Sequence, residues 1–236
     1  MRPADDRMNL AGGIPSRGIV FVTGTDTGVG KTWIGCGLVR ALRAAGRTVV
    51  VRKPAESGCE SRQGVLYPAD AAALRSAAGS DEPLDRVCPV QLEEPLAPGI
   101  AAARAGVIVD PSRIAREIVE RSSEADVVVV EGAGGLLVPL WDKYFYADLA
   151  RDIGASLLVV VGARLGAINQ ALLTLEAASS RGLVVSGLVV NHADPREDTA
   201  TRTLVASFRD LTTVPVLASV PYGHDPAPLL AGQIAL

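Results

Sequence analysis

The stretch GIVFVTGTDTGVGKTWIGCGLVRALRAAG, residues 18–46, decides the fold. Its first residues, 18–23, form a short apolar run that is typical of a buried strand. A glycine-rich loop follows, and then apolar residues recur at helical spacing until Gly46, a plausible helix end. A second apolar run, 47–54, ends at a proline. A strand, loop, helix and strand in this order predict one unit of a parallel sheet. The residues with helical spacing are Ile34, Leu38, Val39 and Leu42.

The loop GTDTGVGKT, residues 24–32, departs by one residue from the usual phosphate-binding spacing. Four residues normally separate its first glycine from the Gly-Lys pair, which would place a glycine at Thr25. The glycine stands one place earlier, at Gly24. Gly28 and Gly30 still permit the backbone shape that lets consecutive N–H groups surround a phosphate. The loop is therefore predicted to bind nucleotide phosphates.

Three side chains of the loop suit that role. Lys31 can reach the β- and γ-phosphates, the Thr32 hydroxyl can bind Mg²⁺, and Thr27 is an additional donor near the phosphates. The alternative is a tight strand-to-helix turn with an incidental lysine, which the order of the surrounding elements disfavours. Asp26 stands where ATPases that act as switches carry a second lysine, so the switch class is disfavoured.

The remaining chain repeats the pattern of buried strands. Apolar runs occur at 125–135, 155–162, 183–191 and 214–221, and a helical stretch covers about 167–181. Strands this uniformly apolar indicate a mainly parallel sheet with helices on both faces, in which ligands bind at the carboxyl edge. We therefore predict an α/β fold of the P-loop NTPase type.

The organisation predicted along the chain is a single domain over residues 18–236. Residues 1–17 carry arginines but no apolar segment, so we expect a disordered leader rather than a secretion signal. The stretch 55–110, rich in Pro, Ala and acidic residues, is expected to be an insertion of helices and loops.

Composition excludes several other classes. A net charge of −3 and 4% aromatic residues argue against a broad nucleic-acid surface or a base-stacking platform. No apolar run is long enough for a membrane span. The three cysteines lack paired spacing, which predicts reduced thiols in a cytoplasmic protein without a structural zinc site.

Several segments together resemble one family, dethiobiotin synthetase. They are GTDTGVGKT (24–32), KPAESG (53–58), VEGAGGLLVPL (130–140), VVGARLGAINQALLT (160–174) and VVNHA (189–193). The resemblance implies a homodimeric enzyme that uses ATP, Mg²⁺ and CO₂ or bicarbonate. It closes a urea ring on 7,8-diaminopelargonic acid through an N-carbamate and a carbamic–phosphoric anhydride, giving dethiobiotin for biotin biosynthesis. The active site lies near the subunit interface.

Lys31 and Lys53 are the candidate cations for this chemistry, because charge develops on phosphoryl oxygens during transfer. Lys53 ends the second strand, at the same sheet edge as Lys31; alone it could equally be a solvated lysine before a turn. The resemblance implies that Lys53 contacts the carbamate and the γ-phosphate. It also implies that Ser57 holds substrate or phosphate oxygens and that Thr27 acts beside them.

The expected Mg²⁺ ligands are Thr32, Glu131 and Asp70. Glu131 follows four valines and ends a buried strand, which is where P-loop proteins place a metal-binding acid; an isolated strand-end glutamate is the alternative. Asp70 enters by resemblance, and an Asp before alanines could equally be a helix N-cap.

Glycines and a helix start complete the expected substrate contacts. Gly134 and Gly135 would let backbone approach the substrate, although residues 132–135 could also be an ordinary glycine turn. Residues 165–169 open a helix, whose free N–H groups favour a carboxylate. The resemblance implies that this helix start comes from the partner subunit and holds the substrate carboxylate. Asn169 could instead be an ordinary helix N-cap. The residues so assigned are Gly166, Ala167 and Asn169.

The resemblance extends to the nucleotide and to the aliphatic chain of the substrate. The base would meet Asn191 and the loop at Pro221 and Tyr222, which could instead be a turn after a strand. Residues 93–102 would flank the aliphatic chain, or simply form a rigid loop. The implied phosphate-loop contacts are Asp26, Thr27, Gly28, Val29, Gly30, Lys31, Thr32 and Trp33.

Three other functions compete with this one. An ATP-dependent amidating synthase of related fold usually has a further glutamine-hydrolysing domain. A non-enzymatic ATP switch that binds a partner or membrane is disfavoured by Asp26 and by the proline-broken C-terminal segment. A small-molecule kinase would need an arginine-rich lid, which we do not find in the sequence.

Overall fold

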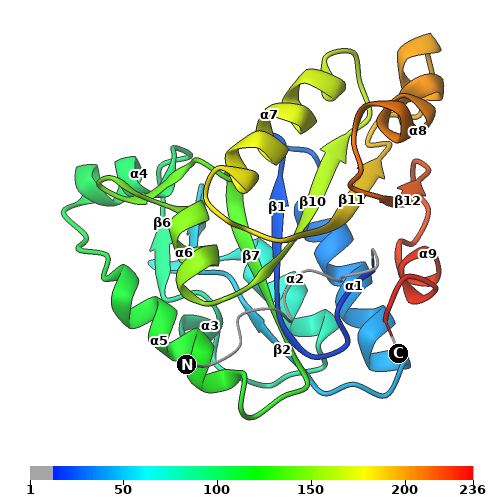
Figure 1. Cartoon of the computed structure of the whole chain (residues 1–236). Helices are drawn as coiled ribbons and strands as arrows, with labels where there is room; N and C mark the ends of the chain where they lie inside the picture. Colours follow the sequence, from blue (N-terminus) through cyan, green and yellow to red (C-terminus); the bar gives the residue numbers. More distant parts are fainter. Residues whose placement is uncertain (1–12, 236) are drawn as a thin grey trace, which may run out of the picture.

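The computed structural model describes residues 13–235, and a six-stranded sheet forms its centre (Figure 1). The strands lie in the order β12-β11-β10-β1-β7-β2, and every neighbouring pair is parallel. This confirms the predicted parallel α/β fold. The strand bounds are Gly18–Gly24 (β1), Val49–Arg52 (β2), Val127–Gly135 (β7), Ser156–Gly162 (β10), Val185–Asn191 (β11) and Val216–Val220 (β12).

The central strands bury both of their faces, which explains their continuous apolar runs. Along β7, Val127 and Val129 belong to one hydrophobic core, whereas Val128 and Val130 belong to the other. The alternation follows from the two-residue period of a strand. Each sheet face therefore has its own core.

Helices cover the two cores separately. Apolar side chains of α1 (Lys31–Ala44), α2 (Ala69–Ala77), α3 (Leu84–Val87) and α9 (Ala227–Ala231) enter one core. The other core receives side chains from α4 (Pro98–Ala105), α5 (Pro111–Arg121), α6 (Tyr146–Asp152), α7 (Ala167–Ser179) and α8 (Thr199–Leu211). In the described part of the chain, no helix combines the length and apolarity needed to cross a membrane.

The stretch 55–110 differs from the expected helices and loops because it also contains short strands. β3 (Ala55–Ser57) pairs in parallel with β6 (Val90–Leu92). β4 (Glu60–Arg62) and β5 (Val65–Tyr67) form an antiparallel hairpin, as do β8 (Pro139–Trp141) and β9 (Tyr144–Phe145) further along the chain. The β4 residues are all exposed, so they carry no apolar alternation from which a strand could be predicted.

The leader expected over residues 1–17 falls mostly, at 1–12, outside the described residues. The expectation of disorder does not hold for the last part of this segment, because Ile14 is fully buried. The Ile14 N–H donates to the Gln233 carbonyl at 2.7 Å, and the Ala235 N–H donates to the Ile14 carbonyl at 2.9 Å. A single apolar side chain thus anchors the chain ahead of β1, and one isolated residue leaves no periodic signal in the sequence.

Candidate active site

The phosphate-binding loop joins β1 to α1 at the carboxyl edge of the sheet. Gly28 and Gly30 both adopt left-handed backbone angles, with φ of 75° and 90°. Gly30 is the N-cap of α1, and no side chain caps this helix end. The first N–H groups of α1 therefore remain available to an anion, and the helix dipole favours negative charge there.

Asn191, at the end of β11, contacts the backbone of the phosphate-binding loop. Its amide Nδ2 donates to the Val29 carbonyl at 2.9 Å, and the side chain is buried. A Cβ atom added to Gly30 would lie 2.2 Å from the same Nδ2, so only glycine fits at this position. The structure thus gives Asn191 a contact with the loop that the sequence did not indicate.

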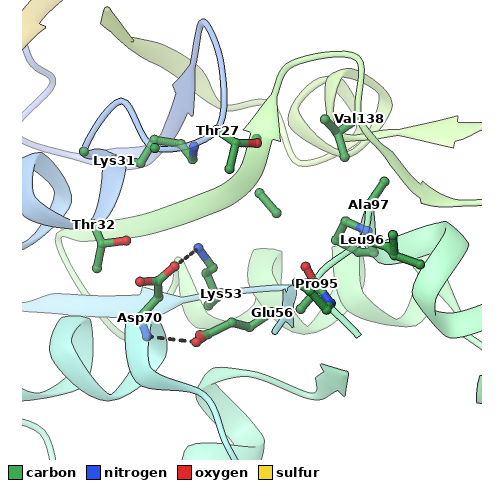
Figure 2. Close-up of a pocket in the computed structure, with 16 residues that line it drawn as sticks. Thr27, Lys31, Thr32, Lys53, Glu56, Asp70, Pro95, Leu96, Ala97 and Val138 are labelled. Carbon is green, nitrogen blue, oxygen red and sulfur yellow. Dashed lines mark hydrogen bonds and ion pairs between the residues drawn. The ribbon is translucent and has the colours of Figure 1, made fainter. Parts of the chain in front are cut away.

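A cavity of about 660 Å³ opens beside the loop (Figure 2). Residues from five separate segments of the chain meet in it. Its lining consists of Thr27, Gly28, Gly30, Lys31, Thr32, Lys53, Glu56, Ser57, Asp70, Pro95, Leu96, Ala97, Pro98, Ala133, Gly134 and Val138. Lys53, Ser57, Asp70 and Gly134 are therefore brought together around one space with part of the expected loop; Asp26, Val29 and Trp33 do not line it.

Lys53 is buried and lies at the centre of an ion cluster beside the loop. Its Nζ is 3.0 Å from Asp70 Oδ2 and 2.5 Å from Glu131 Oε1, and Glu131 also accepts the Thr32 hydroxyl at 2.9 Å. Lys53 is 2% exposed, so it is not a solvated surface lysine. Burial alone would lower the pKa of Lys53, but the Glu131 and Asp70 carboxylates outweigh it and raise that pKa. The ammonium is therefore charged.

Glu131 follows the four buried valines of β7 and is fully inaccessible. Its Oε2 is a buried oxygen without a hydrogen-bond partner among the described residues. A buried carboxylate oxygen is costly to leave unmatched unless a cation or a water meets it. No group of three His, Cys, Asp or Glu side chains suited to a metal occurs within residues 13–235. A cation here would therefore depend on Thr32 together with the two carboxylates.

Asp70 is not a helix N-cap. Pro68 occupies the N-cap position of α2, and Asp70 is the second residue of the helix, with its carboxylate turned toward Lys53 (Figure 2). The cap comes from Glu56, whose two carboxylate oxygens accept the N–H groups of Asp70 and Ala71 at 2.9 and 3.0 Å. The N-cap alternative for Asp70 is wrong, and Glu56 is a residue that the sequence did not single out.

Lys31 extends along the phosphate-binding loop. Its Nζ donates to the Asp26 carbonyl at 3.1 Å, and the side chain is 8% exposed. Burial, together with the neighbouring charge of Lys53, lowers the pKa of Lys31. Figure 2 shows Lys31 and Lys53 on two sides of the cavity. Two cations with few water contacts suit the stabilisation of phosphoryl charge.

An ion pair holds the first part of the loop, at Asp26. Asp26 Oδ2 pairs with the Arg164 guanidinium at 2.5 Å and accepts from Gln170 Nε2 at 3.3 Å. The Asp26 pKa is lowered, first by the Thr27 N–H and then by Arg164. Asp26 therefore links the loop to the segment that begins α7. It occupies the position at which switch ATPases carry a second lysine.

The glycines of 132–135 belong to a strand, not to a turn, because β7 continues through Gly135. The ordinary-turn alternative is therefore wrong. Gly135 pairs with Gly24 of β1, which brings two backbones together beneath the loop. Gly134 has a φ of 63° and lines the cavity.

Other expected site residues lie away from this cavity. Gly166, Ala167 and Asn169 begin α7 and do not line it. Gly166 is the N-cap of α7, so Asn169 is not. Pro221 and Tyr222 follow β12 on the surface, and Trp33 of α1 is 45% exposed. Residues 95–98, by contrast, form one wall of the cavity.

The parallel sheet, the glycine loop and the Lys31–Thr32 pair define the class, which is that of P-loop nucleotide-binding proteins. A family model described as an AAA domain matches residues 19–228. The ATP-dependent dethiobiotin synthetase BioD of Aromatoleum aromaticum is 46% identical over 213 residues, covering 89% of this chain and 94% of that protein. The chain belongs to the dethiobiotin synthetase family.

Further relatives agree with this assignment. Proteins of the same name from Anaeromyxobacter dehalogenans and Nitrosospira multiformis are 45% and 42% identical. Each alignment covers 87% of this chain, and 91% and 89% of the respective relative. The family resemblance seen in the motifs is thereby confirmed.

Solved structures with a similar fold have other activities. The cell division ATPase MinD of Pyrococcus furiosus has a TM-score of 0.58 at 18% identity, covering 92% of this chain and 98% of that one. Cobyrinic acid a,c-diamide synthase of Mycobacterium smegmatis has a TM-score of 0.55 at 18% identity, covering 92% of each chain. At this identity the likeness concerns the fold alone.

Proposed function

We propose that this chain closes the urea ring of dethiobiotin from 7,8-diaminopelargonic acid and CO₂, with ATP as the phosphoryl donor. Family membership supports the reaction. The observation that carries it is the buried Lys53, held by Asp70 and Glu131 in the cavity beside the phosphate-binding loop. A cation in that place suits both a carbamate and a phosphoryl group.

The reaction proceeds through two intermediates, a carbamate and a carbamic–phosphoric anhydride. An amine nitrogen of the substrate adds to CO₂ and loses a proton, which gives a carbamate. A carbamate oxygen then bonds to the γ-phosphorus of ATP while the bond to ADP breaks. Finally the second amine attacks the carbamate carbon, releases phosphate and loses a proton as the ring closes.

The residues of the cavity match the charges of these steps. Lys31 would neutralise the phosphates from the loop side, and Lys53 would face the carbamate and the γ-phosphoryl oxygens from below. The Thr27 and Ser57 hydroxyls line the same space and can donate to phosphate or substrate oxygens. At Gly134 a Cβ atom would lie 2.9 Å from Val138 Cγ2 and 3.3 Å from the Thr27 hydroxyl, so glycine suits this part of the lining.

Magnesium fits the carboxylate cluster. Glu131 Oε2 is a buried oxygen without a partner among the described residues, and Asp70 and Thr32 lie on the same Lys53-centred cluster. We propose Thr32, Asp70 and Glu131 as the residues that hold Mg²⁺, directly or through its waters. When bound, the ion would neutralise negative charge on the phosphoryl oxygens.

The other contacts divide between the nucleotide and the substrate chain. We propose that the α1 N-terminus and the loop from Asp26 to Trp33 bind the phosphates, and that Asn191, Pro221 and Tyr222 bind the base. The apolar wall of residues 95–98 and Val138 suits the aliphatic part of the substrate. ATP use and unpaired cysteines in the described chain favour a cytoplasmic location, which cell fractionation would check.

Phosphate release measures the proposed reaction directly. The purified chain with Mg²⁺ and ATP should release phosphate only when diaminopelargonate and bicarbonate are both present, because the carbamate is the phosphoryl acceptor. Reactions that lack one of the two substrates are the controls, and mass spectrometry should detect dethiobiotin in the complete reaction. Rapid ATP hydrolysis with neither substrate would contradict the proposal.

We also propose a homodimer whose partner contributes the start of α7 to the site. Gly166, Ala167 and Asn169 do not line the cavity of their own chain. Asn169 and Leu173 are four residues apart and lie on one helix face. Leu173 is 57% exposed, and Leu165, just before the helix, is 83% exposed. An exposed apolar face beside a helix N-terminus suits an interface that also binds the substrate carboxylate.

Light scattering tests the homodimer. The wild type should have twice the chain mass of 24.4 kDa. Leu173→Glu should shift it toward the monomer and raise the KM for diaminopelargonate, because a charge buried in an interface is unfavourable. Leu211→Glu is the matched control, since Leu211 is 53% exposed at the end of α8. A monomeric wild type with full activity would refute the shared site.

A further inference from the structure

Glu56 lines the cavity, and both of its carboxylate oxygens accept hydrogen bonds. It is the middle residue of β3 and is 7% exposed. Oε1 accepts the Asp70 N–H at 2.9 Å and Oε2 accepts the Ala71 N–H at 3.0 Å (Figure 2 shows the first of these bonds). One carboxylate therefore binds two of the free donors at the start of α2.

The helix has no other side-chain cap. Pro68 occupies the N-cap position and makes no side-chain hydrogen bond. A local N-cap side chain would normally accept from the second or third residue of the helix, which here are Asp70 and Ala71. Glu56 supplies this bond from a separate strand, so it connects β3 to the first turn of α2.

The bond from Glu56 to the start of α2 also bears on the position of Asp70, which lines the cavity. Asp70 is bonded twice: its backbone N–H to Glu56, and its carboxylate to Lys53 Nζ at 3.0 Å. Glu56 and Lys53 are neighbours along the chain, separated by Pro54 and Ala55. The short segment 53–56 therefore binds both the backbone and the carboxylate of Asp70, whose side chain is otherwise 45% exposed.

The arrangement has an electrostatic cost. Burial is the main cause that raises the pKa of Glu56, and the nearby Asp70 carboxylate adds to it. The two N–H donors and Lys53 act in the opposite direction. A neutral cap such as serine would satisfy the helix without a second buried acid.

We propose that Glu56 is a positioning residue for the ring-closing reaction: through the first turn of α2 it holds the Asp70 carboxylate in the cavity, where Asp70 serves Lys53 and the metal. This inference rests on the proposed function and deepens it. Glu56 acts through Asp70 and does not itself touch the reacting atoms.

A double-mutant cycle tests this pathway. Glu56→Gln keeps the shape but replaces one acceptor with a donor, and we expect kcat to fall by about 10-fold to 100-fold, as when the support of a metal ligand is lost. Asp70→Asn should lose as much or more. If Glu56 acts only through Asp70, the double variant should then be about as active as Asp70→Asn alone.

Losses that multiply in the double variant would show that Glu56 acts independently of Asp70, and would overturn the proposal. Asp110→Asn is the matched control, since Asp110 caps α5 through the Arg113 N–H at 3.0 Å on an exposed helix away from the cavity. It should keep wild-type kcat. Full activity in Glu56→Gln would also refute the role.

Hydrogen exchange gives a readout that does not need activity. The Asp70 and Ala71 amides should exchange slowly in the wild type and faster in Glu56→Gln, measured by NMR without substrates. Unchanged exchange would overturn the proposal even in an inactive protein. A wild type that makes no dethiobiotin would instead refute the proposed function and leave the exchange test standing. If Glu56→Gln does not fold, Glu56→Asp, which is one methylene shorter, replaces it in both measurements.

Discussion

Replacing Lys53 with alanine is expected to lower kcat by about 10²–10³-fold, the effect of removing one preorganised charge donor. Lys53 is 2% exposed and its ammonium is held by Asp70 and Glu131, so its charge is fixed in place at the cavity. Steady-state kinetics with diaminopelargonate, bicarbonate and ATP measure the effect. The loss should appear in kcat, since the charge matters most when phosphoryl and carbamate charges develop.

Lys53→Ala should also lower stability. The change leaves the inaccessible Glu131 carboxylate without its ion-pair partner, and losing one member of a buried pair costs about 3–5 kcal/mol. Thermal unfolding should show this as a lower Tm, and kinetics must be run well below it. Lys143→Ala, at an exposed lysine between β8 and β9, is the control and should change neither property. A loss in kcat of tenfold or less would remove Lys53 from the reaction.

Replacing Glu131 with glutamine is expected to raise the Mg²⁺ concentration for half-maximal activity by more than about tenfold. The variant keeps the size of a side chain that is 0% exposed but removes its charge, and Mg²⁺ prefers charged oxygen ligands. Changes in the surroundings of a metal ligand already cost about 10–100-fold in metal affinity, so loss of a ligand should cost at least as much.

A binding measurement separates the metal from catalysis. Calorimetric titration with ATP should show that added Mg²⁺ tightens binding in the wild type but less in Glu131→Gln. Glu120→Gln, on the exposed side of α5, is the control and should follow the wild type. An unchanged Mg²⁺ titration in Glu131→Gln would show that Glu131 does not serve the metal.

Local patterns were sufficient for the sheet and for the loop. Each strand of the central sheet came from an apolar run, because a strand buried on both faces must be apolar throughout. The exposed strand β4 and the anchor at Ile14 had no such signal. β4 is held by backbone pairing with the nearby β5, and Ile14 by backbone bonds to the distant Gln233 and Ala235; neither kind of bond needs a periodic apolar pattern.

The candidate site divides in the same way. Lys31 and Thr32 follow from a contiguous motif, since the loop and the helix start that use them are adjacent in the chain. Glu56 and Asp70 are fourteen residues apart, and their bond depends on how β3 meets α2. No spacing rule of helices or strands relates such positions, so Asp70 could be read from its neighbours as an N-cap.

The sequence by itself determined the class of fold, the phosphate-binding loop and the family, because each depends on residues that are close together in the chain. Only the tertiary structure decided that Lys53 is buried between Asp70 and Glu131, and that Glu56 caps α2. The physical reason is that burial and ion pairing arise where strand ends and helix starts from distant segments meet, and there the protonation and position of each side chain depend on all of its neighbours.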